Sequence, residues 1–533
     1  MIFGRVKPLD AILATAQKKS LHPTLGPVQL TLFGIGCIIG AGIFALTAVG
    51  AQKAGPGLMI AFMIAGAVCI VAALCYAELA AMIPVAGSAY TYSYAVMGEF
   101  LAWTVGWALV LEYAVAASAV AVTWSGYFSG TILQESFGVA LPAWLAAGPL
   151  ALGGLPGGFI NLPALVIALL VTWLLMIGTN ESARVNAVLV AIKIIALTVF
   201  IILTLPRVEA SNFSPFMPAG VFGGFGSGVG VVGAAATLFF AYVGFDAVST
   251  AAEETKNPQR NVPIGLIGSL LICTIFYMLV TAGAVGAMGG QPLGEGGFVG
   301  PGGVPFPAGS EELARQCAMP QYAEALVCSE EALAHVLRVI GHGTIGNTLG
   351  YAANIALPSV ILILLFGQTR IFFVMSRDGL LPESLSKIHP KWKTPYVVTA
   401  VTGAIVAFAA AFLPVGQLAD IANAGTLYAL LMVAVAVMML RKRDPHRPRK
   451  FRTPMLWLVG PLTIGGCLFL FLNLPTTAML VLPIWGAVGI VLYFAYGYRK
   501  SHLGRGLVEV HETEIHDIEP GIPGVDDAPH EVR

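Results

Sequence analysis

Charged residues are scarce in this sequence. Only 11% of its 533 residues are Asp, Glu, Lys or Arg, against about 25% in ordinary soluble domains. Hydrophobic residues make up 57% of the chain, and the mean hydropathy is +0.83. Because a water-soluble fold cannot bury so much apolar surface, this composition excludes a soluble globular domain, a largely disordered chain and a secreted disulfide scaffold. The net charge is zero, so we expect no nucleic-acid partner.

Motifs of common active sites are also absent. The chain has no HExxH zinc motif and no GxSxG nucleophile motif. It contains no Gly-Lys dipeptide, and it therefore lacks the Walker A loop that binds nucleotide phosphates. These absences argue against an enzyme and against an ATP-driven pump, and we expect neither a cofactor nor a metal site.

Long apolar runs dominate the rest of the chain. A helix needs about 20 mostly apolar residues to cross the hydrocarbon core of a bilayer. The sequence therefore predicts an all-α polytopic membrane protein with twelve spans. The qualifying stretches cover roughly residues 27–52, 57–83, 98–128, 160–178, 185–205, 229–252, 263–288, 346–373, 396–413, 417–440, 455–473 and 478–498.

Basic residues indicate the orientation. If the N-terminus lies inside, inner segments and inner helix halves hold 24 of the 28 basic residues. The four on the outer side are Lys53, Arg207, Arg315 and Arg338. Because cytoplasmic loops are enriched in Lys and Arg, we predict a multi-pass protein of the cell membrane with both termini cytoplasmic.

This topology divides the chain into segments. The core, 27–440, holds spans one to ten and a long outer loop, 289–344, which ends in a predicted amphipathic helix with Leu333, Val336 and Leu337 on one face. The other segments are a cytoplasmic start at 1–26, a basic cytoplasmic loop at 441–454, spans eleven and twelve within 455–498, and an acidic, disordered cytoplasmic tail at 499–533.

Two spans carry helix-breaking sequence near their middle. The first contains Gly40-Ala41-Gly42, and the sixth contains Gly244 among aromatic residues. Irregular backbone at membrane depth is tolerated only where it lines a cavity. The two spans are five helices apart, so a five-helix repeat would be inverted, which is typical of transporters whose broken helices meet at the midplane. The alternative for these glycines is close helix packing.

Ionisable residues inside the spans are candidate functional groups, because a charge in a bilayer is costly. Glu112 lies in the third span, Lys193 in the fifth and Asp246 in the sixth. A buried polar pair that only packs the bundle is the alternative for Glu112 and Asp246. Glu78 and Arg370 lie near the inner ends of their spans, and we interpret them as anchors of cytoplasmic loops.

Six motifs follow one another from the first span to the loop before the ninth. They are GIGCIIGAGIF at 34–44, YAELAAMIPVAGSAYTYSY at 76–94, GWALVLEYAV at 106–115, NESARVN at 180–186, FFAYVGFDAVSTAAEETKNPQRNVP at 239–263 and GQTRIFFVMSRDGLLP at 367–382. With them the chain resembles the amino acid–polyamine–organocation superfamily, and most closely the bacterial members of the cationic amino acid transporter family. The long outer loop departs from those members, and spans ten to twelve match only in hydropathy.

The resemblance implies a LeuT-type fold. In that fold, five-plus-five helices form an inverted repeat with broken spans one and six, and here two additional C-terminal helices complete the twelve spans. The resemblance also implies an L-amino acid site between spans one, three, six and eight. We expect that site to use Ile38, Gly40, Ala41, Gly42, Glu112, Phe240, Ala241, Tyr242, Asp246 and Leu357.

Each end of an amino acid has an expected partner in this site. Backbone amides near Gly40–Gly42 suit the carboxylate, and carbonyls freed at Ile38 and at 240–242 suit the ammonium. The resemblance places Phe240 as an aromatic gate and Leu357 at the side-chain pocket. We expect Glu112 and Asp246 to line the side-chain end, where they would exclude acidic substrates.

Lys193 is the expected coupling residue. The resemblance places its ammonium where related carriers bind sodium, within reach of the Ile38 carbonyl and of Ser359. Sodium would then have no vacant site, which leaves the proton as the coupling ion. The alternative is a permanently charged structural pin.

Two of the seven cysteines fall in the outer loop. Cys317 and Cys328 have ten residues between them, and the topology places them in an oxidising compartment. We predict a disulfide between them, and two free thiols are the alternative.

These features predict a secondary active transporter in the lipid bilayer. The expected function is a proton-coupled L-amino acid permease for cationic or small and aliphatic neutral substrates, working by alternating access. A sodium-coupled or uncoupled exchanger is the nearest alternative. An ion channel is less favoured because the lone charges lie near helix breaks and do not form repeated rings.

Overall fold

The computed structural model describes residues 5–6, 25–83, 88–149, 158–178, 183–250, 255–288, 311–317, 319, 322, 324–392 and 394–505. Within these residues the regular structure is helical, apart from one isolated bridge between Leu25 and Thr255. Eight of the described helices are long and apolar enough to cross a membrane, and four shorter apolar helices accompany them. The protein is therefore an all-helical polytopic membrane protein, as the composition predicts.

In chain order the elements used below are α2 (Pro27–Ile38), α3 (Ala41–Phe44), α4 (Leu46–Ala54), α5 (Leu58–Met82), α6 (Ser88–Val96), α7 (Glu99–Tyr127), η2 (Phe128–Ser136), α9 (Leu162–Ile177), α10 (Ala183–Thr204), α11 (Gly230–Leu238), η5 (Phe239–Tyr242), α12 (Ala247–Thr250), α13 (Pro258–Met288), α14 (Glu311–Cys317), η8 (Leu326–Cys328), α15 (Ala332–Val339), α16 (Gly343–Arg377), α17 (Tyr396–Phe412), α18 (Val415–Arg443), α19 (Leu456–Leu472), α20 (Thr476–Leu492) and α21 (Tyr498–Lys500).

Helix α7 forms the centre of the bundle. It packs along α16 and α18, and almost all of its residues are buried. Helix α20 lies at the periphery and exposes Leu480, Ile484 and Val491. Because many large apolar side chains are exposed on the bundle, its periphery suits contact with lipid.

The first apolar stretch is broken after α2. Ile39 and Gly40 leave the helical conformation, and α3 and α4 continue beyond them. A Cβ atom on Gly42 would lie 2.3 Å from the Cα atom of Ala241 in the sixth stretch. The glycine therefore permits the close approach of two backbones, at the position where the sequence predicts a break.

The sixth stretch is broken as well. Helix α11 runs into η5, and the chain then passes through Gly244, which has a φ of +100°, before α12 begins. Glycine adopts this left-handed conformation without the strain that a side chain would cause. The two broken stretches are in direct contact beside their breaks, because Gly42 packs on Ala241.

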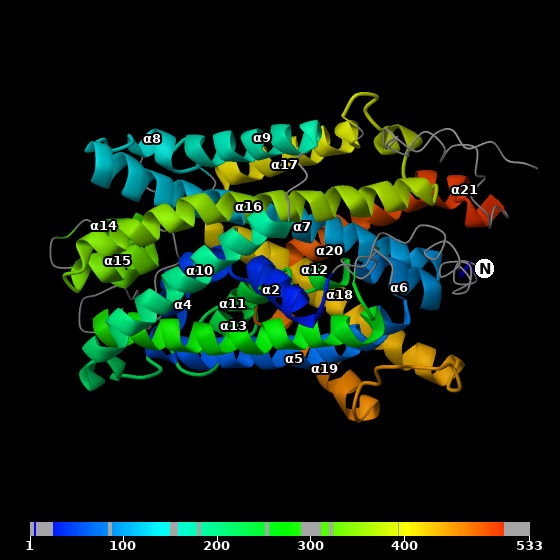
Figure 1. Ribbon diagram of the computed structural model, residues 1–533, viewed down its shortest axis with the longest axis horizontal. Helices are drawn as coiled ribbons and strands as arrows, with labels where there is room; N and C mark the ends of the chain where they lie inside the picture. Colours follow the sequence, from blue (N-terminus) through cyan, green and yellow to red (C-terminus); the bar gives the residue numbers. More distant parts are fainter. Residues whose placement is uncertain are drawn as a thin grey trace, which may run out of the picture.

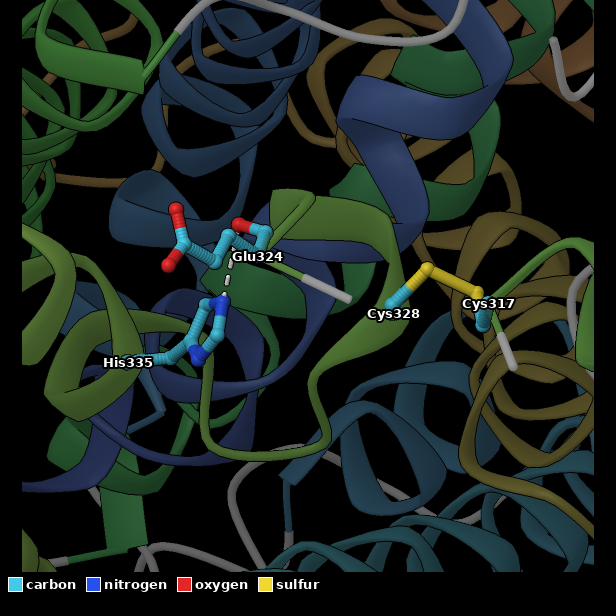
Figure 2. The surroundings of a disulfide bond; sticks show 4 residues. All are labelled: Cys317, Glu324, Cys328 and His335. Carbon is cyan, nitrogen blue, oxygen red and sulfur yellow. Dashed lines mark hydrogen bonds between the residues drawn. A yellow bond between two sulfur atoms is a disulfide. The ribbon is translucent and has the colours of Figure 1, made fainter. Parts of the chain in front are cut away.

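The described part of the outer loop lies at one end of the bundle, where α14 and α15 are found (Figure 1). Leu333, Val336 and Leu337 of α15 are fully buried, so the predicted amphipathic helix packs its apolar face inward. Cys317 and Cys328 form a disulfide with a Cα–Cα distance of 5.5 Å, which links the end of α14 to η8 (Figure 2).

A hydrogen bond from Arg338 joins α15 to the bundle, and an ion pair with Glu331 at the start of α15 holds the guanidinium. The Arg338 guanidinium contacts Glu331 Oε1 at 2.8 Å and donates to Thr131 Oγ1 in η2 at 2.9 Å. In addition, His335 Nε2 lies 3.0 Å from the carbonyl oxygen of Glu324, which connects α15 to the segment between the two cysteines (Figure 2). The loop is thus attached by charged as well as apolar contacts.

Candidate functional site

A cavity lies where the two broken stretches meet α7 and α16. Of the residues expected at the substrate site, Ile38, Gly40, Ala41, Gly42 and Phe240 line it. The remaining lining residues are Cys37, Ala116, Val120, Val243, Val360 and Leu364. This apolar cavity contains no ionisable carboxylate, ammonium or guanidinium group in its lining, and its walls are aliphatic on the α7 and α16 sides.

Three expected site residues lie beside this cavity without lining it. Ala241 packs against Gly42, as described above. The Tyr242 hydroxyl donates to the carbonyl oxygen of Phe62 at 3.0 Å, which holds the aromatic ring in the bundle. Leu357 is fully buried.

Tyr277 of α13 joins the two breaks. Its hydroxyl lies 2.9 Å from the carbonyl oxygen of Ile38 and 2.9 Å from that of Ala241. Both are carbonyls freed by the helix breaks, and both were expected to face a substrate ammonium. Each carbonyl oxygen has two lone pairs, so each keeps one for a second donor. Sequence reasoning missed Tyr277, although a tyrosine hydroxyl inside an apolar helix signals that a hydrogen-bond partner is needed.

The two intramembrane carboxylates line a second cavity, here called the acidic cavity. Glu112 and Asp246 border it together with Tyr76, Thr426 and Gly244. Ala89, Leu109, Phe245, Ala429 and Leu430 complete its lining. The sequence-based expectation placed these carboxylates at the side-chain end of the substrate site, whereas in the structure neither one lines the apolar cavity.

Hydrogen bonds distinguish the two carboxylates. Asp246 Oδ2 accepts from the Tyr113 hydroxyl at 3.0 Å and from Ser88 Oγ at 3.3 Å. Glu112 Oε2 is buried and has no hydrogen-bond partner among the residues that the structure describes. A buried carboxylate oxygen without a donor is costly, so Glu112 is the less satisfied member of the pair.

Lys193 of α10 lies at the break of the first stretch. The side chain is buried, with a relative exposure of 2%, and Nζ donates to the carbonyl oxygen of Gly36 at 2.9 Å. This acceptor lies two residues before Ile38, the expected partner, whose carbonyl accepts from Tyr277. Ser359 Oγ donates to the Ala356 carbonyl in its own helix. An ammonium in the last turn of α2 is also favoured by the helix dipole.

A further charged cluster links three elements outside both cavities. Lys53 Nζ at the end of α4 lies 3.3 Å from Asp420 Oδ2 of α18 and 2.5 Å from Thr237 Oγ1 of α11. The Thr237 hydroxyl donates to Asp420 Oδ1 at 2.6 Å. The sequence identified Lys53 only as an outer basic residue, because residue spacing does not show which helices meet.

Glu78 has the structural role that its position predicts. Its carboxylate pairs with Arg441 and with Arg449 of the loop between α18 and α19. Arg370 stacks on the ring of Phe366 with 4.0 Å between its guanidinium carbon and the ring centroid. Neither residue lines either cavity.

Comparison with known proteins places the chain among transporters. A family model described as amino acid permease matches residues 25–496. The chain is 43% identical over 506 residues to the branched-chain amino acid permease BcaP of Bacillus subtilis (strain 168), which covers 95% of this chain and 99% of that relative. It is 41% identical over 502 residues to the methylthioribose transporter of the same organism, covering 94% and 99%.

The chain is also similar to a plant protein. The chain is 36% identical over 429 residues to the chloroplastic cationic amino acid transporter 9 of Arabidopsis thaliana, which covers 80% of this chain and 68% of that relative.

Proposed function

Because the chain belongs to the amino acid permease family, within the amino acid–polyamine–organocation superfamily, and is a transporter and not an enzyme, we propose that it is a proton-coupled permease for neutral L-amino acids with aliphatic side chains. The observation that carries this proposal is the apolar cavity at the two helix breaks, which has no charged side chain in its lining.

The cavity wall supports an aliphatic side chain. Val120 of α7 and Val360 and Leu364 of α16 offer methyl groups to a valine, leucine or isoleucine substrate. A cationic side chain would lose its hydration there without gaining a counter-ion, which is unfavourable. An acidic side chain would meet the same cost and the repulsion of Glu112 and Asp246 in the adjacent cavity.

The names of the relatives agree in part. One relative is named a branched-chain amino acid permease, one a methylthioribose transporter and one a cationic amino acid transporter. Methylthioribose carries hydroxyl groups that need buried hydrogen-bond partners. Cys37 offers only a weakly polar thiol in the apolar lining, so we favour the branched-chain substrate.

The backbone at the breaks supplies the polar partners. Amides at the start of α3, near Gly40 and Ala41, suit the substrate carboxylate. The second lone pairs of the Ile38 and Ala241 carbonyls suit the ammonium, beside the bonds they accept from Tyr277. Phe240 in the lining is the proposed gate.

We propose alternating access in a LeuT-type arrangement of twelve spans with both termini cytoplasmic. The positions of the breaks support this arrangement, since the α2–α3 and η5–α12 gaps lie in the first and sixth apolar stretches. Eight long and four shorter apolar helices are compatible with twelve spans.

Lys193 is the proposed coupling residue. When charged, its ammonium holds the last turn of α2 through the Gly36 carbonyl. When the proton leaves, that interaction weakens, and α2 is free to move. Protonation would thereby be linked to opening, and sodium would have no vacant site at this position. The alternatives are sodium coupling, uncoupled exchange and a permanently charged pin.

Uptake into proteoliposomes tests the substrate class. We expect saturable uptake of radiolabelled L-leucine, competed by valine and isoleucine at concentrations at least about tenfold lower than by arginine, methylthioribose or glutamate. If arginine or methylthioribose competed most strongly, that compound would be the assigned substrate in place of leucine. Linear, non-saturating flux would indicate a channel.

A gradient experiment tests the coupling. In sodium-free liposomes with an inward proton gradient, we expect wild-type protein to accumulate leucine, and Lys193→Ala to bind leucine and exchange it without accumulating it. Accumulation that persists in Lys193→Ala would exclude the coupling role. If the wild type accumulated leucine only when sodium was present, sodium and not the proton would be the coupling ion.

A further inference from the structure

The segment from the last residues of α18 to the start of α19, residues 441–454, has no part in the proposed transport cycle. It is called the basic loop here, because it holds seven Lys or Arg residues and one acidic residue, Asp444. It lies toward the end of the bundle that carries α6 and α21, where its segment is drawn in orange (Figure 1). Its sequence predicts a cytoplasmic anchor, but an anchor needs fewer positive charges than the loop contains.

The basic loop has a fixed shape. Arg449 lies inside it, with a side-chain exposure of 1%, and its guanidinium donates to the carbonyl oxygen of Asp444 at 2.7 Å and contacts Glu78 Oε1 at 3.1 Å. Arg441 pairs with the other oxygen of Glu78, which also accepts from the backbone amide of Thr453 at 2.8 Å. The buried carboxylate at the inner end of α5 thus fixes both ends of the loop.

Four cations remain after these pairs are made. Arg447 is 3.6 Å from Asp444, the single acidic residue of the loop. The other four side chains are exposed, and they have no hydrogen bond or ion pair with the residues that the structure describes: Lys442, Arg443, Lys450 and Arg452. A rigid group of four uncompensated positive charges attracts anions, and it loses little conformational freedom when one binds.

Exposed apolar residues follow directly after these cations. Met455, Trp457 and Leu458, at the start of α19, have relative exposures of 73%, 62% and 59%. Tryptophan is enriched where the polar headgroups of a membrane meet its apolar core. A ligand that fits both parts of this surface has an anionic head and an apolar body, which a free phosphate or a nucleotide lacks.

We propose that the basic loop and the first turn of α19 form a binding surface for anionic phospholipid. The lipid phosphate accepts hydrogen bonds from Arg443 and Arg452, and the acyl chains lie against Trp457 and Leu458. Basic clusters immediately beside a membrane helix bind anionic lipid, and each Lys or Arg strengthens the binding about fivefold. The proposal is independent of the substrate and of the coupling ion.

Thermal unfolding in detergent tests this surface. The purified full-length protein is titrated with phosphatidylglycerol, with phosphatidylcholine and with inorganic phosphate. The loop variant combines Lys442→Gln, Arg443→Gln, Lys450→Gln and Arg452→Gln. The control variant loses the same charge at other exposed positions through Lys256→Gln, Arg260→Gln, Lys387→Gln and Lys391→Gln.

We expect phosphatidylglycerol to raise the unfolding temperature of the wild type and the control variant more than phosphatidylcholine does. In the loop variant, the phosphatidylglycerol concentration for half of the effect should rise at least about 100-fold, given about fivefold for each cation. Trp457→Ala should weaken the same response without removing charge. Inorganic phosphate should leave the unfolding temperature unchanged.

Several results would overturn the proposal. One is a loop variant that responds to phosphatidylglycerol as the wild type does. Another is an equal loss in the control variant, which would mean that overall charge alone matters. A third is an equal response to inorganic phosphate, which would indicate an anion site without a lipid. If the fourfold variant does not fold, the pair Arg443→Gln and Arg452→Gln carries the same test, with about a 25-fold rise expected.

Discussion

The two cavities touch the same broken stretch but differ in chemistry. The apolar cavity meets it at Val243 and offers aliphatic walls, while the acidic cavity meets it at Gly244 and contains Glu112 and Asp246. In the proposed function, a neutral amino acid finds its side-chain contacts and its backbone partners in the first cavity. The difference teaches that an intramembrane charge can lie close to a helix break without lining the cavity at that break.

The largest effect on transport should come from adding a side chain where the two broken stretches touch. In Gly42→Ala the new methyl group would lie within 2.3 Å of the Ala241 Cα atom. Overpacking of this kind costs about 1–3 kcal/mol, and here it would fall on the backbone that forms the apolar cavity. We expect leucine uptake to fall at least about tenfold. Gly465→Ala is the control, because its added Cβ meets no atom within 4 Å. Normal uptake by Gly42→Ala would mean that the cavity does not need this contact.

A pair of substitutions separates the two cavities. Val360→Ala removes two methyl groups from the apolar lining, at about 0.8 kcal/mol each when they contact the substrate. We therefore expect the KM for leucine to rise about fifteenfold, whereas Glu112→Gln should change it less than about twofold. Val401→Ala, on an exposed face of α17, is the matched control. The opposite ranking of the two variants would place the substrate side chain in the acidic cavity.

Tyr277→Phe examines how the breaks are held. The substitution keeps the ring and removes the hydroxyl that contacts the Ile38 and Ala241 carbonyls. The hydroxyl shares its one hydrogen between the two carbonyls, and its loss costs about 0.5–1.5 kcal/mol, so the unfolding temperature should fall by about 1–2 °C, with about a threefold loss of leucine uptake. Tyr351→Phe, on a partly exposed part of α16, serves as control. An unchanged unfolding temperature would show that the hydroxyl does not stabilise the breaks.

The smallest effect on transport should come from the outer disulfide, which lies outside both cavities. Replacing Cys317 and Cys328 by serine opens a short loop, and the chain-entropy model gives a stability loss of about 2–3 kcal/mol. We expect a lower unfolding temperature with a change in leucine KM below about twofold. Reducing agent should shift the wild type in the same direction and leave the double variant unaffected. A large change in KM would mean that the outer loop shapes the substrate cavity.

Local sequence predicts local features well. Gly40 and Gly244 mark the two breaks, and the spacing of the two outer cysteines leads to the disulfide that the structure contains. Five of the expected substrate residues line one cavity, because they belong to two short motifs at the breaks. Glycine leaves such a signal because its backbone is freer than that of other residues, and cysteine because its thiol can form a disulfide.

Contacts between distant helices could not be predicted in this way. Tyr277 and the cluster of Lys53, Thr237 and Asp420 depend on how helices rotate against one another, which span lengths do not determine. The same reason explains why the sequence did not indicate Gly36 as an acceptor for Lys193 or a separate cavity for the two carboxylates. A rotation of one helix by a single residue changes the partner of every side chain on it.

A structure determined with L-leucine bound tests the central claim most directly. We predict density for the isobutyl group between Val120, Val360 and Leu364, with the carboxylate at the amides that begin α3. Density for the side chain beside Glu112 and Asp246, in the acidic cavity, would contradict the assignment.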